Sequence, residues 1–322
     1  MTPLLWRGAV PLGLYVLLKG LNATVLKGLQ EMGAQRLVDG ENPISFCNVF
    51  FLAQMIVGLA VMLPGRRQLG LDLARLMPSD RRLLAVDAFL GLFLGPVAYY
   101  FALSSLSVIS QTLIFALVLP VSALLAQRLL AEPLPDGFGV SFGLIGLGLL
   151  LANLAGGAVG GGGMGAAMDN LAGVSWALLG VLAFSGAAVT GRRIASKGWS
   201  GALTVGLAST VSALIFGLLA LLLFGPGHFV LLQLWWVVGV IGLYGLTLSL
   251  GSELALRRAY AELPVATVSL WGSLTIVVAV LSAALLLGEQ ISAPTLAGVG
   301  LLLLGVSREH WHRRLVTGLR RP

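Results

Sequence analysis

Lys19 is the residue whose type and position could do the most chemistry in this chain. It lies near the middle of the apolar stretch 9–30, about 15 Å from either end of a helix that would span a membrane. A charge at that depth costs at least about 2.5–3.5 kcal/mol on insertion scales, and intramembrane charges usually serve function. One interpretation is an ammonium that meets an anionic substrate group, such as a carboxylate or phosphate. The alternative is a lysine that is paired structurally within the helix bundle, or one that is partly neutral.

The neighbours of Lys19 support a site rather than an isolated charge. Tyr15, Lys19, Asn22, Leu26 and Gln30 recur three or four positions apart, so one face of this helix is mostly polar. Such a face is unsuited to contact with lipid and natural beside a water-filled cavity. We therefore predict that Tyr15, Lys19 and Asn22 bind a substrate.

Other candidate wall residues are amides, hydroxyls and aromatic rings in later apolar stretches. Each either bonds to a neighbouring helix or faces a cavity, because lipid satisfies no polar group. The predicted substrate-binding residues among them are Tyr99, Gln111, Trp176, Ser185, Tyr244 and Trp271. Tyr99 and Trp176 are also near enough to the expected outer boundary to be interfacial aromatics.

Acidic and basic residues four positions apart form a second kind of candidate. Glu253 precedes Arg257 at this spacing, which favours a local ion pair, with a proton-coupling carboxylate as the alternative. Lys27 and Glu31 have the same spacing and the same expected pairing. Asp87 lies near a basic edge of its apolar stretch and is expected to reach the membrane interface.

The sequence lacks the constellations that enzymes and metal sites need. His228, His310 and His312 fall in an outer loop and the tail, so no core serine has a histidine base beside it. Cys47 is the single cysteine, and neither clustered metal ligands nor phosphate-binding loops occur. We expect a protein that is not an enzyme and that has no cofactor and no metal.

Membrane helices are the elements that must position these residues. Hydrophobic residues make up 57% of the chain and charged ones 10%, with a mean hydropathy of +0.96. Apolar stretches of about 20 residues, enough to cross about 30 Å of hydrocarbon, recur from end to end. The ten predicted spans are 9–30, 43–63, 83–103, 106–128, 135–155, 170–190, 201–224, 233–256, 263–287 and 292–307.

Positive charge is distributed unevenly about these spans. With the N-terminus inside, 17 of the 20 Lys and Arg residues fall in inner segments, and Arg36 alone lies in an outer loop. Retention of positive charge on the cytoplasmic side gives this bias. It predicts a multi-pass protein of a bacterial cytoplasmic (inner) membrane with both termini cytoplasmic. The net charge of +7 then reflects topology and the lipid bilayer, and no nucleic-acid partner is expected.

A glycine-rich segment divides the chain almost in half. Seven of the residues 156–165 are glycine, a composition typical of a flexible linker. Five spans on each side would place the second half upside down in the membrane, as in the inverted repeats of secondary transporters. The predicted organisation is a first five-helix repeat at 1–155, a linker loop at 156–168, and a second five-helix repeat with a basic cytoplasmic tail at 169–322.

The two halves also match weakly in sequence. At an offset of 157 positions, residues 101–134 lie over residues 258–291 without a gap. Leucine matches are common in membrane helices, but Glu132 then meets Glu289, each just beyond the end of a span. Two interfacial carboxylates on unrelated helices are the alternative interpretation.

Four short motifs carry a resemblance to a known family. They are Lys19-Gly20-Leu21-Asn22 followed by Lys27, Ser185-Gly186 followed by Arg193, Ala259-Tyr260-Ala261, and Leu287-Gly288-Glu289-Gln290. Together with ten spans in two inverted halves, they resemble the EamA-like members of the drug/metabolite transporter superfamily. The first motif is similar to the W-G-x-N pattern of that family's first span, with Lys19 in place of the tryptophan.

The resemblance implies a function and a location for its site. We expect a secondary transporter that moves a small metabolite, amino acid-like or related and for export, by alternating access. Its cavity would be lined by spans 1, 3, 4, 6, 8 and 9. Lys19 suggests a second candidate, an organic-anion or phosphorylated-metabolite antiporter. A candidate of another class is a non-transporting membrane component, such as a lipid-handling partner or receptor. The oligomeric state stays open.

The predicted topology can be tested by chemical labelling. In a Cys47→Ser background, single cysteines placed near Ala74, Ser196 and Gly318 should react with an impermeant thiol reagent only from inside. Cysteines at Gly162 or Gly227 should react only from outside. Outside labelling near Ser196 would contradict ten spans.

Overall fold

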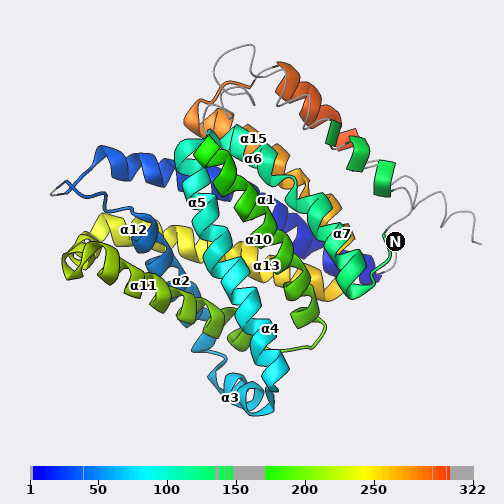
Figure 1. The fold of residues 1–322 in the computed structure, drawn as a ribbon, viewed down its shortest axis with the longest axis horizontal. Helices are drawn as coiled ribbons and strands as arrows, with labels where there is room; N and C mark the ends of the chain where they lie inside the picture. The colour runs from blue at the N-terminus through cyan, green and yellow to red at the C-terminus, as the bar shows by residue number, and fades with distance from the viewer. Residues whose placement is uncertain are drawn as a thin grey trace, which may run out of the picture.

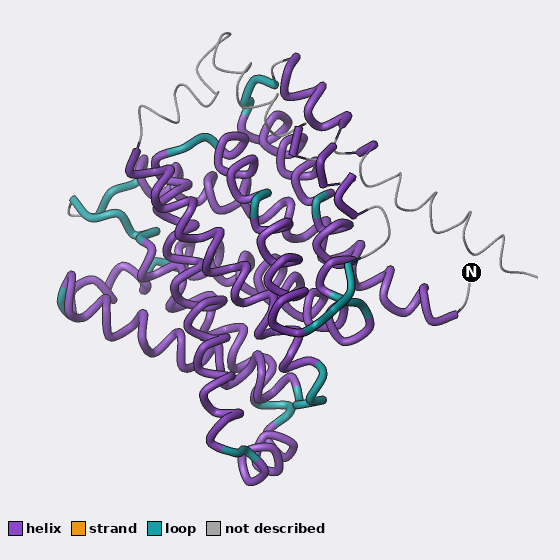
Figure 2. The backbone as a smooth tube through the Cα atoms, turned by 45° about the vertical axis from the view of Figure 1, so that its right-hand side comes forward, coloured by secondary structure: helices purple, strands orange, loops and turns teal. Residues whose placement is uncertain are grey.

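The computed structural model describes residues 3–38, 40–134, 138–140, 142–144, 146–147, 171–291, 293–301 and 303–304. In these ranges the regular elements are all helices, and the β structure amounts to one isolated bridge between Val38 and Glu41 (Figure 2). The prediction of an all-α chain is confirmed for this part of the protein.

The elements with complete bounds follow one another in the order seen in Figure 1. They are α1 (Pro3–Gln35), α2 (Phe46–Met62), α3 (Arg66–Arg75), α4 (Pro78–Ala88), η1 (Phe89–Leu94), α5 (Gly95–Ser105), α6 (Val108–Phe115), α7 (Val118–Leu130), α10 (Leu171–Ala195), η2 (Ala202–Leu207), α11 (Ala208–Phe224), η3 (Pro226–Gln233), α12 (Trp235–Tyr244), η4 (Gly245–Ser249), α13 (Leu250–Glu262), α14 (Val265–Gly272) and α15 (Leu274–Leu287).

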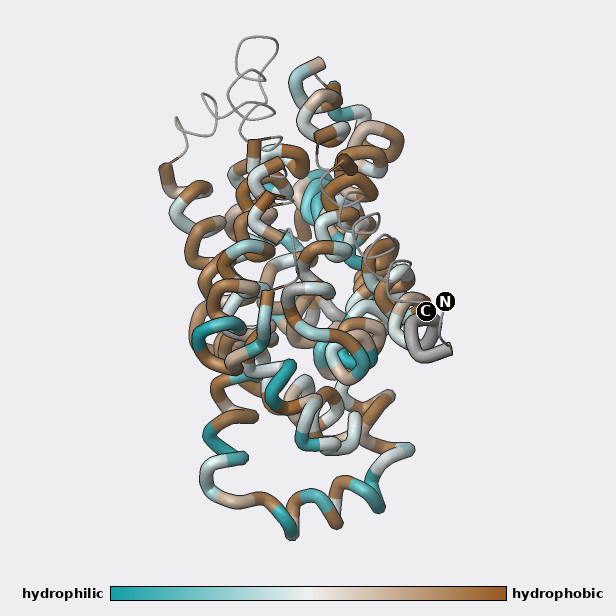
Figure 3. Tube along the Cα trace, turned by 90° about the vertical axis from the view of Figure 1, so that its right-hand side faces the viewer, coloured by the Kyte–Doolittle hydropathy of each residue, from teal (hydrophilic) through white to brown (hydrophobic). Residues whose placement is uncertain are grey.

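Seven described helices are long and apolar enough to cross a membrane. They are Gly8–Gln35, Pro78–Ser105, Val108–Leu130, Leu171–Ala195, Ala202–Phe224, Trp235–Glu262 and Leu270–Leu287. An eighth candidate consists of α2 and α3, which are bent by 90° at their junction. This arrangement is that of a multi-pass membrane protein, and the apolar residues run along the long helices in Figure 3.

These eight helices correspond to predicted spans 1 to 4 and 6 to 9. The fifth and tenth predicted spans, 135–155 and 292–307, fall partly outside the described residues, which include helical pieces at 138–140, 142–144, 146–147, 293–301 and 303–304. The predicted linker at 156–168 and the basic tail lie outside the described residues altogether.

Local sequence signals explain where several helices begin. The hydroxyl of Ser45 accepts a hydrogen bond from the Asn48 amide at the start of α2, at 3.2 Å. Ser107 caps α6 in the same way through the Ser110 amide, at 3.1 Å. Such caps satisfy amide groups that have no partner within the helix, which matters most where water is scarce.

The bundle is built by pairing helices from opposite halves of the chain. Helix α1 packs against α13 and α15, and α10 packs against α5 and α7. Figure 1 shows α10 alongside the long path formed by α4 and α5. Helix α2 packs against α11. Each half therefore supplies walls for the other, and neither half encloses the centre alone.

The packing of α2 against α11 is particularly close. A side chain at Gly58 would place its Cβ 2.3 Å from Thr210 Oγ1 and 2.7 Å from the Thr210 amide nitrogen, so no side chain fits there. Further along the same contact, the rings of Phe50 and Phe216 lie 5.1 Å apart between centroids. The two helices are in contact at backbone distance at one end and through aromatic rings at the other.

The two halves repeat the same order of breaks at the offset of 157. Helices α5 and α13 end at Ser105 and Glu262, α6 and α14 begin at Val108 and Val265, and α7 and α15 end at Leu130 and Leu287. A π-helical turn interrupts the preceding span in both halves, as η1 and η4. Such turns leave carbonyls free of their usual partners, and Ser212 of α11 donates to Leu92 O of η1 at 2.9 Å.

Two glutamates at equivalent positions connect the halves reciprocally. Glu132, beyond α7, accepts a hydrogen bond from the Val265 amide at the start of α14, at 3.0 Å. Glu289, beyond α15, accepts from the Val108 and Ile109 amides at the start of α6, at 3.0 and 3.2 Å. Each span therefore ends where the other begins, so α6–α7 and α14–α15 run in opposite directions.

Each glutamate follows a residue in the left-handed backbone conformation. Ala131 has φ 53° and ψ 28°, and its equivalent Gly288 has φ 68° and ψ 19°. This conformation ends the helix and turns the chain so that the next side chain reaches the facing span. It costs an L-residue roughly 1–2 kcal/mol but is freely open to glycine.

Exchanging these two residue types should change stability in opposite directions. Ala131→Gly should stabilise the protein by up to about 1 kcal/mol, and Gly288→Ala should destabilise it by about 1 kcal/mol or more. A Cβ at Gly288 would meet no atom within 4 Å, so only backbone strain contributes there. Thermal unfolding of both variants in detergent measures the effect. Destabilisation by Ala131→Gly would contradict the left-handed cap.

Candidate functional site

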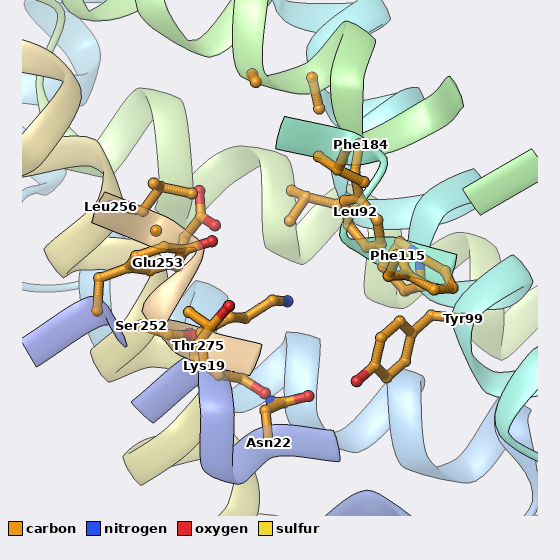
Figure 4. Close-up of a pocket in the computed structure, with 18 of the residues that line it drawn as sticks. Lys19, Asn22, Leu92, Tyr99, Phe115, Phe184, Ser252, Glu253, Leu256 and Thr275 are labelled. Atoms are coloured by element: carbon orange, nitrogen blue, oxygen red, sulfur yellow. The ribbon is translucent and has the colours of Figure 1, made fainter. Parts of the chain in front are cut away.

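A central cavity of about 260 Å³ lies between elements of both halves. Its described walls come from α1, α2, the α4–η1–α5 span, α6, α7, α10, α11, the α12–η4–α13 span, α14 and α15. Figure 4 shows Lys19, Asn22, Ser252 and Glu253 gathered on one side and Tyr99, Phe115 and Phe184 on the other. The cavity is therefore polar on one wall and aromatic on the other.

The polar face predicted for the first span lies on this cavity. Tyr15, Lys19, Asn22 and Leu26 of α1 all line it, as their helical spacing requires. Gln30, one turn further, instead donates a hydrogen bond to Tyr100 O at 3.2 Å and lies beyond the cavity. The first four residues of the pattern therefore face the cavity, and the cavity ends before Gln30.

Lys19 extends its ammonium into the open centre without a charged partner. Its Nζ lies 5.1 Å from the ring centroid of Phe184 and 5.7 Å from that of Tyr99, distances at which a cation is attracted to an aromatic face. No described residue accepts a hydrogen bond from it or forms an ion pair with it. Figure 4 shows the amine directed between the two walls. The positive charge is held by aromatic rings and remains free to bind an anion.

Tyr244 and Asn22 continue the polar wall. The hydroxyl of Tyr244, at the end of α12, donates to Asn22 Oδ1 at 3.4 Å. Both side chains are buried and both line the cavity. This bond crosses from the first half to the second, so it also fixes α1 relative to α12.

A chain of ion pairs occupies one end of the cavity. Arg257 Nε donates to Glu253 Oε1 at 2.6 Å, as the spacing of four predicts. Arg257 Nη2 donates to Asp87 Oδ2 at 2.7 Å, and Thr190 Oγ1 donates to Asp87 Oδ1 at 2.7 Å. All but Thr190 line the cavity. The arginine holds two carboxylates from different halves together.

Asp87 and Lys27 differ from their sequence predictions. Asp87 was expected at the membrane interface, but it is buried, with 3% of its surface exposed, because Arg257 and Thr190 hold it from two sides. That prediction was wrong. Lys27 was expected to pair with Glu31, but its Nζ donates to Leu103 O at 2.9 Å, and no ion pair joins those two described residues.

The basic residue that repeats the role of Lys27 is Arg192. Its Nη1 donates to Tyr260 O, and Tyr260 lies 157 positions after Leu103, the carbonyl that Lys27 reaches. Arg192 Nε also donates to Glu132 Oε1 at 2.7 Å. The motif had pointed to Arg193, one residue later. By its contacts Lys27 corresponds to Arg192, whereas the motif aligned Lys27 with Arg193.

The remaining predicted substrate-binding residues lie behind the cavity wall. Gln111 donates to Tyr99 O at 2.9 Å, and Ser185 donates to Val118 O at 3.4 Å; both are fully buried between helices. Trp176 stacks on Phe101 with centroids 5.1 Å apart. Trp271 packs with the buried residues of α1 and α14. None of these four is among the residues that line the cavity.

The aromatic wall is the part of the site that sequence reasoning missed. Phe115 and Phe184 line the cavity beside Tyr99, and the three rings contact one another with centroids 4.9 to 6.4 Å apart. Phenylalanine is common in membrane helices, so these residues carried no signal of their own. Their distance from Lys19 could be known only from the packing of α6 and α10 around α1.

Comparisons with known proteins add a fold-level result. No family model matches the chain, and no curated protein matches it in sequence. A solved structure resembles it over nearly its whole length, covering 93% of this chain and 98% of that chain, with a TM-score of 0.58 and 21% identity. At that identity the likeness shows a shared fold and nothing of the function.

The ion-pair chain should be important for stability. Arg257→Met would leave Asp87 and Glu253 without their shared partner, and breaking a buried pair in this way costs about 3–5 kcal/mol. Arg258→Met, at the exposed neighbouring position, should change stability by less than about 0.5 kcal/mol. Adding Asp87→Asn to Arg257→Met should restore part of the loss. Thermal unfolding in detergent measures these changes. Equal stability of the Arg257→Met and Arg258→Met variants would contradict this role.

Proposed function

We propose that this protein is a secondary transporter that carries a small metabolite through the central cavity by alternating access. The observation that carries the proposal is a cavity with an unpaired ammonium, walled by elements of both halves, at the centre of a multi-pass helical bundle. A cavity of about 260 Å³ suits a small metabolite.

The arrangement of α6–α7 and α14–α15 supports this mechanism. The two spans are antiparallel and joined at both ends by equivalent glutamate contacts. Inverted repeats of this kind have two states of similar energy, because exchanging the conformations of the repeats turns one state into the other. The cavity can then open at one end and close at the other by exchanging equivalent contacts between the two repeats.

Lys19 supports an anionic group on the substrate. Its ammonium lies over two aromatic faces and donates to no described acceptor, so a carboxylate or phosphate would gain a charge-assisted hydrogen bond there. This observation favours the second candidate, an organic-anion or phosphorylated-metabolite antiporter, over carriers of purely cationic compounds. Export across a bacterial cytoplasmic membrane remains the direction and location that we propose from the resemblance.

Reconstitution separates transport from the alternative of a receptor or lipid-handling partner. Compounds that stabilise the purified protein thermally would first be identified, because a ligand of the folded state raises its apparent stability. Liposomes that contain only this protein should then exchange such a compound across the bilayer. Binding without any flux would leave the non-transporting alternative.

Substitutions at Lys19 test its role in binding. Lys19→Met should nearly abolish ligand binding and leave the fold intact, since no described residue accepts a hydrogen bond from its ammonium. Lys19→Arg should keep part of the affinity, because the charge survives in a different geometry.

Lys27→Met provides a matched control eight residues further along α1. It should lower stability through loss of the bond to Leu103 O while ligand affinity stays the same. Thermal stability with and without ligand, together with exchange rates, distinguishes the two lysines. Full transport with unchanged affinity in Lys19→Met would overturn the anion-site assignment.

A further inference from the structure

The charges on the cavity wall sum to zero. The charged side chains among its described lining residues are Lys19, Asp87, Glu253 and Arg257. Arg257 is joined to both carboxylates, so that group of three carries a net formal charge of −1. Lys19 carries +1, and no described hydrogen bond or ion pair joins it to these three residues. The empty cavity is therefore neutral overall but has a positive and a negative pole.

Net neutrality limits what the cavity can accept. In a space of low dielectric constant, an uncompensated charge is costly, whereas a pair of opposite charges can be stabilised by matching poles. A monoanion bound at Lys19 would leave the occupied cavity with a net charge of −1, and a monocation would leave it with +1. A molecule that carries one charge of each sign would leave it neutral.

The negative pole has a free acceptor that faces the same space. Glu253 Oε1 accepts from Arg257 Nε, but no described group donates to Glu253 Oε2. Figure 4 shows the Glu253 carboxylate and the Lys19 amine on the same side of the cavity, opposite Tyr99, Phe115 and Phe184. The charged groups thus occupy one wall, and the uncharged aromatic wall is left for the apolar part of a ligand.

We propose that the cavity selects zwitterionic compounds, with the anionic group at Lys19, the cationic group at Glu253, and an apolar body against Tyr99, Phe115 and Phe184. This inference rests on the proposed transport function and narrows its substrate class. It also makes Glu253 a specificity-determining residue. Among the organic anions that Lys19 favours, it selects those that also carry a positive group.

Matched sets of ligands test the charge rule directly. Each set holds one carbon skeleton as a zwitterion, as the carboxylate without the amino group, and as the amine without the carboxylate. Suitable sets are alanine, propanoate and ethylamine; leucine, 4-methylpentanoate and 3-methylbutylamine; and phenylalanine, 3-phenylpropanoate and 2-phenylethylamine. The zwitterionic member of each set should stabilise the purified protein at much lower concentration than the other two members. Equal stabilisation by a carboxylate or amine member, or none by any zwitterion, would overturn the proposal.

Charge variants should invert the preference in a predictable way. Lys19→Met leaves the cavity at −1, so the ratio of amine to carboxylate affinity should rise at least tenfold. Glu253→Gln leaves it at +1, so the same ratio should fall at least tenfold, with Arg257 still paired to Asp87. Loss of affinity for all members without any change in their ratio would count against a dipolar site.

Glu262→Gln is the matched control for Glu253→Gln. It removes the same charge from the exposed end of the same helix, α13, and should change neither affinity nor selectivity. Transport assays keep this inference distinct from the proposed function. Flux of a compound with a net charge would refute the charge rule and leave the transporter standing. Binding of zwitterions without flux would refute transport and leave the rule standing.

Discussion

The need to satisfy backbone amides inside a membrane governs how this protein is built. Helices α6 and α14 begin at Val108 and at Val265, where the first amides of a helix have no intrahelical partner. The carboxylates of Glu289 and Glu132 supply those partners from the opposite half. A negative charge at a helix N-terminus is also favoured by the helix dipole. In each of these two contacts, a carboxylate and an unsatisfied helix start stabilise each other.

The sharing of hydrogen-bond partners also explains how the cavity holds charged side chains. Arg257 is shared between Glu253 on its own helix and Asp87 from the other half, so three charges need little water. Lys19 has no such partner and relies on the faces of Tyr99 and Phe184. A paired group suits a role in holding the bundle together. An unpaired ammonium in the same space is the one that a ligand can reach without breaking an existing bond.

The sequence predicts the helical class, the positions of the seven described spans and the polar face of α1, because apolar length and helical spacing are local properties. It also predicts the pair between Glu253 and Arg257 and the correspondence of Glu132 with Glu289. It does not predict which way a helix is turned about its axis. Gln111 and Ser185 face neighbouring backbones rather than the cavity, since the packing of α5, α7 and α10 decides their direction. Asp87 was misplaced because its partner Arg257 lies 170 positions away in the chain.

The contact between α2 and α11 bears on how a molecule of this kind can move. At Gly58 the backbones approach so closely that sliding or rolling of one helix over the other would bring Thr210 into collision with the chain. In a carrier, such a pair of helices would move as one rigid unit, and relative motion would be confined to the helices around it. The ion pair of Arg192 with Glu132 joins α10 to the end of α7, outside this pair. In a carrier, a disulfide that joins α2 to α11 at a distance from Gly58 would consequently leave the cycle unhindered, whereas the same link between α7 and α14 would stop it.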